Sequence, residues 1–389
     1  MSSRTSVNRI LVVGREVGSI VKLLKEKTPK VLIGAVDVLG NQETRLFSDW
    51  AFSVEKQTPD VSVLRSKHRD LLELLYELTK VMLEDLEFDL LVPLSPFHTR
   101  PNYIQELSRE INIAFSNISS LEKTSSTFNF LKTVSSEFPN TFSPDVYLSE
   151  SINLKVDDFP FILISKFKTK ILSSKASLHS ITVNKTDFIF PVPQIHCAFF
   201  IANPNILHFL GLQTLSSPYQ HSFFSDHFEK NALIPFSSKS VLSIKEITSF
   251  CSSIINTLEI QGLVTVYFSV IEDSFFPISC TVIPDENFEV WENRITTTLA
   301  PFLISRETKS ILHLSASKFA FKFPIYSFRP IRVPFIPKEF ASQRNLMGVI
   351  SNPEYPLCAI SGSGSTFSDV QTQIQEKKSK IIKILNSIA

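Results

Sequence analysis

Apolar residues alternate with other residues along positions 262–287, and this alternation predicts two strands joined by a tight turn. The polar residues 272–274 mark the turn between the strands. Every second residue on each side of the turn is apolar: Val264, Val266, Phe268 and Val270 before it, and Phe276, Ile278, Cys280 and Val282 after it. Because successive side chains of a strand point to opposite faces, we expect a hairpin with one buried face.

The N-terminal part of the chain has the pattern of a parallel sheet covered by helices. Apolar runs at 9–13, 31–36 and 88–92 predict buried strands, and helical spacing over 16–27 and 68–86 predicts the helices between them. Gly14, Gly18 and Asp37 match part of a dinucleotide-binding fingerprint. The G-x-G-x-x-G spacing is missing, and an acid after the second strand is common in such folds, so we favour structural roles for these residues.

The rest of the chain alternates predicted strands and helices. We expect helices at 117–134, 244–258, 289–303 and 366–389, the last capped by residues 368–371. We expect strands at 159–164, 187–192 and 355–361, a strand-like segment at 319–333, a hairpin formed by 196–201 and 207–212, and a Gly-Ser turn at 362–365. The fold class is therefore α/β (α+β), in two or three domains at this length.

Composition narrows the classes of function. The chain is 43% hydrophobic and 20% charged, which is typical of a globular protein, and its net charge of +1 argues against nucleic-acid and anionic-membrane partners. No apolar run is long enough to span a bilayer, and the N-terminal apolar segment is too short for a signal peptide, so we expect a cytoplasmic protein with no membrane partner. The four cysteines have no metal-ligand spacing and are expected to be buried thiols.

Two residue types are used unusually. Glycine occurs only 9 times, and none lies between Gly40 and Gly211. A loop that holds phosphate groups usually needs glycine so that backbone N–H groups approach the ligand closely, and the middle of the chain has no such residue. Phenylalanine occurs 34 times, which indicates either a Phe-rich core or a buried interface and leaves the oligomeric state open.

Several short segments, in this order, resemble the ATP-grasp family, namely the ligases of the carbamoyl-phosphate-synthase-like group to which tyramine–glutamate ligases belong. Glu122-Lys123 is similar to the Asp-Lys that opens the ATP-grasp domain, and residues 159–164 are similar to the strand that delivers a nucleotide-binding lysine. Residues 186–189 resemble the strand at the adenine hinge, with Asp187 at the position of its glutamate. Residues 348–385 resemble the C-terminal segment of the family.

The resemblance implies an ATP-grasp fold with an N-terminal βαβ domain at 1–115, a small nucleotide-side lobe at 116–193, a large lobe at 194–330 and a C-terminal cap at 331–389. It implies ATP as the ligand, contacted by Lys123, Lys166 and Asp187, and a small carboxylate or amine as the substrate. Lys166 is one or two positions out of register with the family's lysine. For Lys123 and Lys166 the alternative is a solvated surface charge, which we favour, and for Asp187 it is a turn cap.

The positions of the family's three metal ligands carry Tyr267, Thr281 and Ile283. Magnesium prefers carboxylate and water oxygens, so we expect neither a magnesium site nor a catalytic residue there. A shifted register instead offers Asp273, Asp285 and Glu286 as acids. Two functions follow: an ATP-dependent carboxylate–amine ligase relative with weakened or lost catalysis, or a non-catalytic protein that binds a nucleotide or a partner.

Four polar side chains have competing interpretations. His98 and Arg100, in the loop after the strand at 88–92, are candidates for an anionic substrate, and a rigid Pro-rich loop is the alternative. His196 and His208 flank one predicted hairpin and suggest a metal site. No carboxylate or cysteine completes the ligand spacing, so we favour structural histidines.

Overall fold

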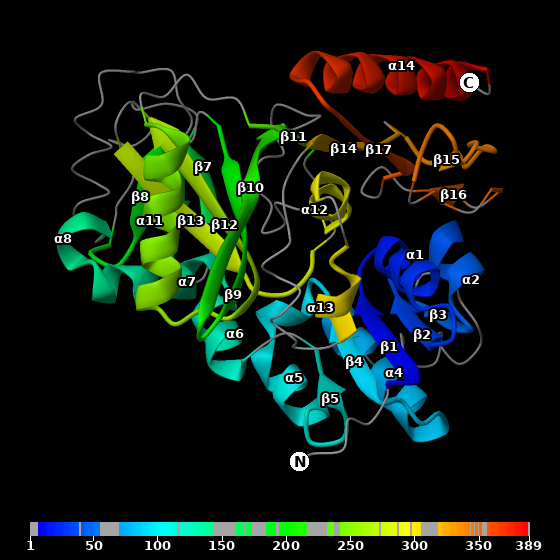
Figure 1. Cartoon of the computed structure of the whole chain (residues 1–389), viewed down its shortest axis with the longest axis horizontal. Coiled ribbons are helices and arrows are strands. Elements are labelled where there is room, and N and C mark those ends of the chain that lie inside the picture. The colour runs from blue at the N-terminus through cyan, green and yellow to red at the C-terminus, as the bar shows by residue number, and fades with distance from the viewer. Residues whose placement is uncertain are drawn as a thin grey trace. The chain divides into compact units, whose positions relative to one another are not determined.

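The computed structural model describes residues 7–38, 40–54, 70–114, 117–142, 161–166, 169–172, 184–191, 194–216, 232–236, 242–271, 274–285, 288–295, 298–304, 318–327, 329–342, 344–345, 347–348, 350–351 and 356–387. The chain divides into two compact units, drawn together in Figure 1. Unit 1 contains residues 1–115 and 283–389, and unit 2 contains residues 116–282. The chain therefore leaves unit 1 to build unit 2 and then returns to unit 1.

The N-terminal half of unit 1 is a five-stranded sheet in the order β3-β2-β1-β4-β5. Each strand is parallel to its neighbours, which confirms the predicted βαβ opening. The central strands are apolar along nearly their whole length, as expected for strands buried on both faces. The strands are β1 (Arg9–Gly14), β2 (Leu32–Asp37), β3 (Trp50–Ser53), β4 (Leu90–Pro93) and β5 (Asn112–Ile113).

Helices connect these parallel strands. The longest begins where the carboxylate of Asp70 accepts the N–H of Leu72, and it buries leucines such as Leu75 and Leu78 at helical spacing. The helices are α1 (Gly18–Lys27), α2 (Gln42–Phe47), α4 (Leu71–Asp85), the 3-10 helix η1 (Phe97–Thr99) and α5 (Pro101–Leu107).

The C-terminal half of unit 1 is built on two antiparallel strands, β14 (Phe319–Ile325) and β17 (Cys358–Gly364). A long helix, α14 (Phe367–Asn386), covers them through an apolar cluster that includes Phe321, Ile360 and Ile381. The remaining elements are α12 (Phe288–Arg294), α13 (Ala300–Ile304) and the short strands β15 (Ile331–Arg332) and β16 (Ile350–Ser351).

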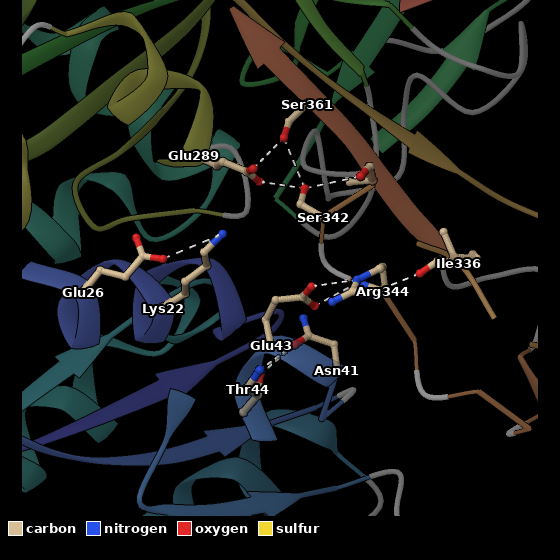
Figure 2. A network of polar contacts seen from close by, with 11 residues as sticks. Lys22, Glu26, Asn41, Glu43, Thr44, Glu289, Ile336, Ser342, Arg344 and Ser361 are labelled. Atoms are coloured by element: carbon tan, nitrogen blue, oxygen red, sulfur yellow. Dashed lines mark hydrogen bonds and ion pairs between the residues drawn. The ribbon is translucent and has the colours of Figure 1, made fainter. Parts of the chain in front are cut away.

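Two buried ion pairs join the two halves of unit 1. Lys322 of β14 lies 3.7 Å from Glu16 of the β1–α1 loop, measured from Nζ to Oε2. Arg344 Nε donates to Glu43 Oε1 on α2 at 3.0 Å, as Figure 2 shows. Both side chains of each pair are less than one tenth exposed, so a segment more than 300 residues away in sequence completes the N-terminal domain.

Unit 2 contains two antiparallel sheets and four described helices. The small sheet has the order β7-β6-β8. In the larger sheet β9 pairs with β10 and β12, which pair in turn with β11 and β13. The strands are β6 (Phe161–Ile164), β7 (Thr169–Leu172), β8 (Phe188–Pro191), β9 (His196–Asn203), β10 (Ile206–Ser216), β11 (Ala232–Pro235), β12 (Gly262–Ile271) and β13 (Ser274–Thr281), and the helices are α6 (Ile118–Thr124), α7 (Thr127–Glu137), α8 (Pro139–Phe142) and α11 (Ile244–Thr257).

The structure confirms the predicted hairpin as β12 and β13. Gly262 begins β12 where the chain passes very close to the end of the second strand. A Cβ atom at Gly262 would lie 2.4 Å from the carbonyl oxygen of Val282, and φ at Gly262 is 128°. Only glycine is therefore compatible with the close approach at this end of the hairpin.

Four predicted elements differ from the structure. The helix expected at 117–134 is two helices, because the Ser126 side chain accepts the N–H of Asn129 and starts α7 anew. The Gly-Ser turn expected at 362–365 is wrong in its first part: Gly362 and Gly364 pair with β14 and extend β17. The expected helix 289–303 is divided into α12 and α13, and the strand-like segment 319–333 into β14 and β15.

The N-terminal cap of α14 also differs from the prediction. Thr366 and Asp369 form a reciprocal capping box, in which the Thr366 hydroxyl accepts the N–H of Asp369 and the Asp369 carboxylate accepts the N–H of Thr366. The helix therefore begins at Phe367. No described helix has both the length and the hydropathy to cross a bilayer.

Candidate functional site

A row of hydroxyl side chains lies on one face of the β12–β13 hairpin. Directly paired residues of antiparallel strands share a face, and Thr265 pairs with Thr281 while Tyr267 pairs with Ser279. Ser269 follows on the same face of β12. We call Thr265, Tyr267, Ser269, Ser279 and Thr281 the hydroxyl row. The prediction of the hairpin used the apolar residues of these strands. The residues that alternate with them carry the hydroxyl groups and could have been used to find this row.

The hydroxyl row is enclosed by protein. Tyr267 is 1% exposed and is among the largest fully buried side chains. Among the described residues, the hydroxyl oxygens of Ser269 and Thr281 are buried and have no hydrogen-bond partner. All five side chains are neutral in ordinary conditions, and the row therefore provides hydroxyl groups but no carboxylate.

The opposite face of this sheet is packed against helices. Phe250 of α11 stacks on Phe275 of β13 with ring centroids 5.2 Å apart. On the same face His196 Nδ1 lies 3.0 Å from Thr214 Oγ1, and burial lowers the pKa of His196 to about 4. His196 is thus a buried neutral histidine in the sheet.

The register of β9 and β10 separates the two histidines of the hairpin. His196 pairs with Thr214 at one end of the ladder, and His208 pairs with Ile201 near the other end. Among the described residues no group of three His, Cys, Asp or Glu side chains is placed to hold a metal ion. This geometry therefore supports structural roles for both histidines.

The residues that the family resemblance assigns to the three metal-ligand positions do not fit a magnesium ion. Tyr267, Thr281 and Ile283 are 1%, 6% and 1% exposed, and a magnesium ion requires carboxylate or water oxygens in near-octahedral geometry. Of the acids in the shifted register, Asp285 is buried at 5% exposure, whereas Asp273 and Glu286 lie outside the described residues.

Lys123 of α6 makes a structural contact. Its ammonium group donates to the carbonyl oxygen of Leu258, at the end of α11, at 2.6 Å. Nearby, the Ser120 hydroxyl accepts the N–H of Gln261 at 3.0 Å. These two bonds tie α6 to the connection between α11 and β12. The ammonium group therefore caps a helix C-terminus, where a positive charge is favoured by the helix dipole.

We expect Lys123→Met to destabilise the protein by about 1–2 kcal/mol, because it removes a charge-assisted hydrogen bond to the carbonyl group of the buried Leu258. The measurement is the urea-unfolding free energy. Lys132→Met is the matched control, because Lys132 is an exposed helical lysine of α7 and should change stability by less than about 0.5 kcal/mol. Equal effects of the two substitutions would contradict the capping role.

Lys166 and Asp187 lie at the same end of the small sheet. Ile164 of β6 pairs with Phe188 of β8, so the residues just beyond these positions are neighbours. Lys166 has an exposed side chain. The Asp187 carboxylate accepts the backbone N–H and the side-chain amide N–H of Asn184, each at 3.0 Å. Asp187 is therefore a turn cap in this structure, and its role in contacting ATP stays a prediction.

The residues that resemble a dinucleotide-binding fingerprint make contacts within the N-terminal domain. The Asp37 carboxylate accepts the N–H of Glu16 at 3.1 Å and the hydroxyl of Thr44 at 2.6 Å. A Cβ atom at Gly18 would lie 2.3 Å from Asn41 Oδ1, so this side chain fills the space above the helix start. The dinucleotide alternative therefore gains no support from the geometry.

Arg100 and His98 lie in the loop after β4. Arg100 Nη2 lies 3.4 Å from Asp70 Oδ2 in an exposed ion pair, as expected for a solvated loop residue. His98 belongs to the same loop and is half-buried in η1. An anionic substrate at these residues stays a prediction.

All four cysteines are free and buried, as predicted. Burial raises the pKa of the Cys251, Cys280 and Cys358 thiols, to about 12 for Cys358. Because the thiolate is the reactive form, these groups are unreactive core residues and are not part of a site.

Comparison with known proteins detects the fold but not the sequence family. No family model matches the chain, and no curated protein matches its sequence. Among solved structures, a biotin carboxylase from Campylobacter jejuni superposes with a TM-score of 0.67 at 10% identity, covering 94% of this chain and 89% of that one. An L-amino acid ligase from Bacillus licheniformis superposes with a TM-score of 0.63 at 10% identity, covering 96% and 98%.

A third similar structure is the biotin carboxylase domain of 2-oxoglutarate carboxylase from Hydrogenobacter thermophilus. It superposes with a TM-score of 0.64 at 11% identity, covering 93% of this chain and 87% of that one. That structure contains MgADP, ADP and bicarbonate, and the Campylobacter jejuni enzyme is a β,γ-ATP complex. At these identities the likeness concerns the fold, and it extends over almost the whole chain.

Proposed function

Because the chain has the ATP-grasp fold, the fold of ATP-dependent carboxylate–amine ligases and biotin carboxylases, we propose that it is a ligase relative that has lost magnesium-dependent phosphoryl transfer. Enzymes of this class phosphorylate a carboxylate with ATP, and a nucleophile then attacks the acyl phosphate. Magnesium neutralises the charge that develops on the phosphates during the first step. In our proposal this protein uses the fold to bind a ligand without turnover.

The burial of Tyr267 carries the proposal. Its ring occupies the middle of the hydroxyl row, where the family resemblance places an acidic metal ligand, and its side chain is fully enclosed. A phenol is a poorer ligand for a hard cation than a carboxylate. The apolar Ile283 and the neutral Thr281 offer no replacement for the missing charge.

Nucleotide binding without metal is the form of the proposal that we favour. The likeness to nucleotide-bound structures over more than nine tenths of the chain supports it. Within residues 116–193, the proposed nucleotide-side lobe, Lys166 is the cation that we assign to a phosphate group, because its side chain is exposed at the end of β6. A carboxylate or an amine would be the second ligand of the same fold.

The alternative is a non-catalytic protein whose partner is another protein. Two observations favour it. Lys123 and Asp187 already bond to other groups of the chain, and the side chains of the hydroxyl row are buried. In that case the ATP-grasp fold is inherited and no nucleotide binds.

Titration calorimetry with ATP separates these functions. We expect an ATP affinity that changes less than twofold when magnesium is added, and no release of ADP or phosphate in the presence of amino acids. Lys166→Met should weaken ATP binding about tenfold, or about 1.4 kcal/mol, whereas the control Lys132→Met should not.

Three results of this experiment have distinct meanings. Binding that strengthens tenfold or more with magnesium, together with ADP release, would overturn the proposal and would point to the acids of the shifted register. Magnesium-independent binding supports it. Absence of ATP binding leaves the partner-binding alternative.

A further inference from the structure

Two large apolar side chains stand exposed beside the β15–β16 ribbon of unit 1. Phe335 is 63% exposed and Met347 is 69% exposed. The exposed basic side chains of Arg329, Arg332 and Lys338 belong to the segment 329–342, which also carries Phe335. We call these five residues the ribbon patch, and we propose that it is the docking site for an acidic segment of a protein partner that also carries apolar side chains.

The two apolar residues of the ribbon patch come from segments that are bonded side by side. β15 and β16 are antiparallel, with Arg332 opposite Ile350. Next to this pair, the N–H of Gly348 donates to the carbonyl oxygen of Val333 at 2.8 Å. Phe335 is two residues beyond Val333, and Met347 immediately precedes Gly348. The strand register thus brings both exposed side chains to the same end of the ribbon.

The backbone holds Phe335 outward. Val333 and Ile336, on either side of it, are 2% and 3% exposed, and Ile336 belongs to the apolar cluster beneath α14. The Ile336 carbonyl oxygen also accepts a hydrogen bond from Arg344 Nη1 at 3.2 Å, as Figure 2 shows. A side chain held between two anchored neighbours loses little conformational entropy on binding.

The segment that carries Met347 is anchored as well. The side-chain amide of Asn345 donates to the carbonyl oxygen of Pro356 at 2.9 Å, and its backbone N–H donates to that of Leu357 at 3.0 Å. Gly348 has a φ of 83° and closes the turn on the other side. Methionine is adaptable and aromatic rings provide large contact areas, so this pair is typical of the apolar centre of an interface.

A third exposed apolar residue belongs to a helix that bonds to the segment before Met347. The N–H of Gln42, at the start of α2, donates to the carbonyl oxygen of Arg344 at 2.9 Å. One turn later on α2, Leu46 is 63% exposed. A single exposed apolar residue is ordinary, but three of the most exposed ones on joined segments indicate a contact surface.

The charge of the ribbon patch favours an acidic partner. Among the described residues of these segments there are three exposed cations and one exposed acid, Glu339. An acidic partner segment would pair with the cations while its apolar side chains cover Phe335 and Met347. Segments that bind anionic lipid usually carry about 4–8 basic residues, and three cations on a chain of net charge +1 fall short of this, so a protein segment is favoured over a membrane.

The test uses a randomised peptide-display library sorted against the full chain. Clones are counter-selected against the double variant Phe335→Ser/Met347→Ser, and the enriched peptides are synthesised for fluorescence-anisotropy titration. Because both side chains are exposed, the variant is expected to keep the wild-type thermal midpoint. Ile244→Ser is the matched control, since Ile244 is a 56% exposed apolar residue of unit 2.

We expect enriched peptides that combine Asp or Glu with aliphatic or aromatic residues. Their affinity should fall at least tenfold in Phe335→Ser/Met347→Ser and in Arg329→Glu/Arg332→Glu, and should be unchanged in Ile244→Ser. The proposal is overturned if no peptide is enriched, if enriched peptides are not acidic, or if they bind all variants equally.

Two further results would also overturn the proposal by naming another occupant. The first is binding of the wild type to phosphatidylserine–phosphatidylcholine vesicles that the Phe335→Ser/Met347→Ser variant abolishes. The second is a dimer, seen by light scattering, that dissociates in that variant. None of these measurements involves ATP, so the outcome is separable from that of the nucleotide experiment.

Discussion

Replacing Arg344 by leucine is expected to lower the free energy of unfolding by about 3–5 kcal/mol, because it leaves a buried carboxylate without its cation. Arg344 Nε donates to Glu43 Oε1 and the backbone N–H of Arg344 donates to Glu43 Oε2, each at 3.0 Å. The two side chains are 9% and 8% exposed, so water cannot replace the lost partner without local opening. Urea denaturation of the purified variant measures the change.

The exposed pair in Figure 2 provides a control for this substitution. Lys22 Nζ lies 4.0 Å from Glu26 Oε1, with both side chains about half exposed. Lys22→Leu should therefore change stability by less than about 0.5 kcal/mol. The double variant Glu43→Leu/Arg344→Leu should recover part of the loss, because it also removes the unpaired charge. Equal effects of Arg344→Leu and Lys22→Leu would show that the buried Glu43–Arg344 pair contributes no more to the free energy of unfolding than an exposed pair.

Acidification is expected to destabilise the protein through His196. The pKa of this histidine is lowered from 6.5 to about 4 by burial in the sheet. A group with a depressed folded pKa contributes stability above its unfolded pKa and loses it as the pH falls toward the folded value. For His196 this loss begins near pH 6.5 and amounts to about 2 kcal/mol by pH 5 and about 3 kcal/mol by pH 4.

The measurement is the unfolding free energy at a series of pH values from 7.5 to about 4.5. His196→Gln is the informative variant, because glutamine keeps a hydrogen-bonding group for Thr214 and does not titrate. The variant should be less stable than the wild type at pH 7.5, and its stability should fall less steeply below pH 6.5. Parallel curves for the two proteins would mean that His196 is protonated in the fold or accessible to water.

The regular elements of this protein are predictable from local patterns. Period-2 alternation located the β12–β13 hairpin, and apolar runs located β1, β2 and β4. The wrongly predicted elements have local causes whose strength the hydrophobic pattern does not reveal. Ser126 caps a new helix within a helical pattern, and pairing with β14 draws Gly362 into a strand despite its weak strand propensity.

For the candidate site, the sequence names residues, and the structure adds their burial and contacts. The family resemblance assigns Tyr267, Thr281 and Ile283 to the metal-ligand positions, but their near-complete burial is a property of packing. For Asp187 the sequence allowed a turn cap or an adenine contact, and its two bonds to Asn184 favour the cap.

By itself, the sequence determined the succession of strands and helices, the ATP-grasp resemblance and the absence of acids at three expected metal positions. All of these depend on which residues stand at short spacings along the chain. Only the tertiary structure decided that Lys123 caps a carbonyl group 135 residues away, that Arg344 pairs with Glu43 across 301 residues, and that Phe335 and Met347 share one end of a ribbon. Contacts of this kind arise when distant segments pack together, and local periodicity contains no information about which distant partner a side chain will meet.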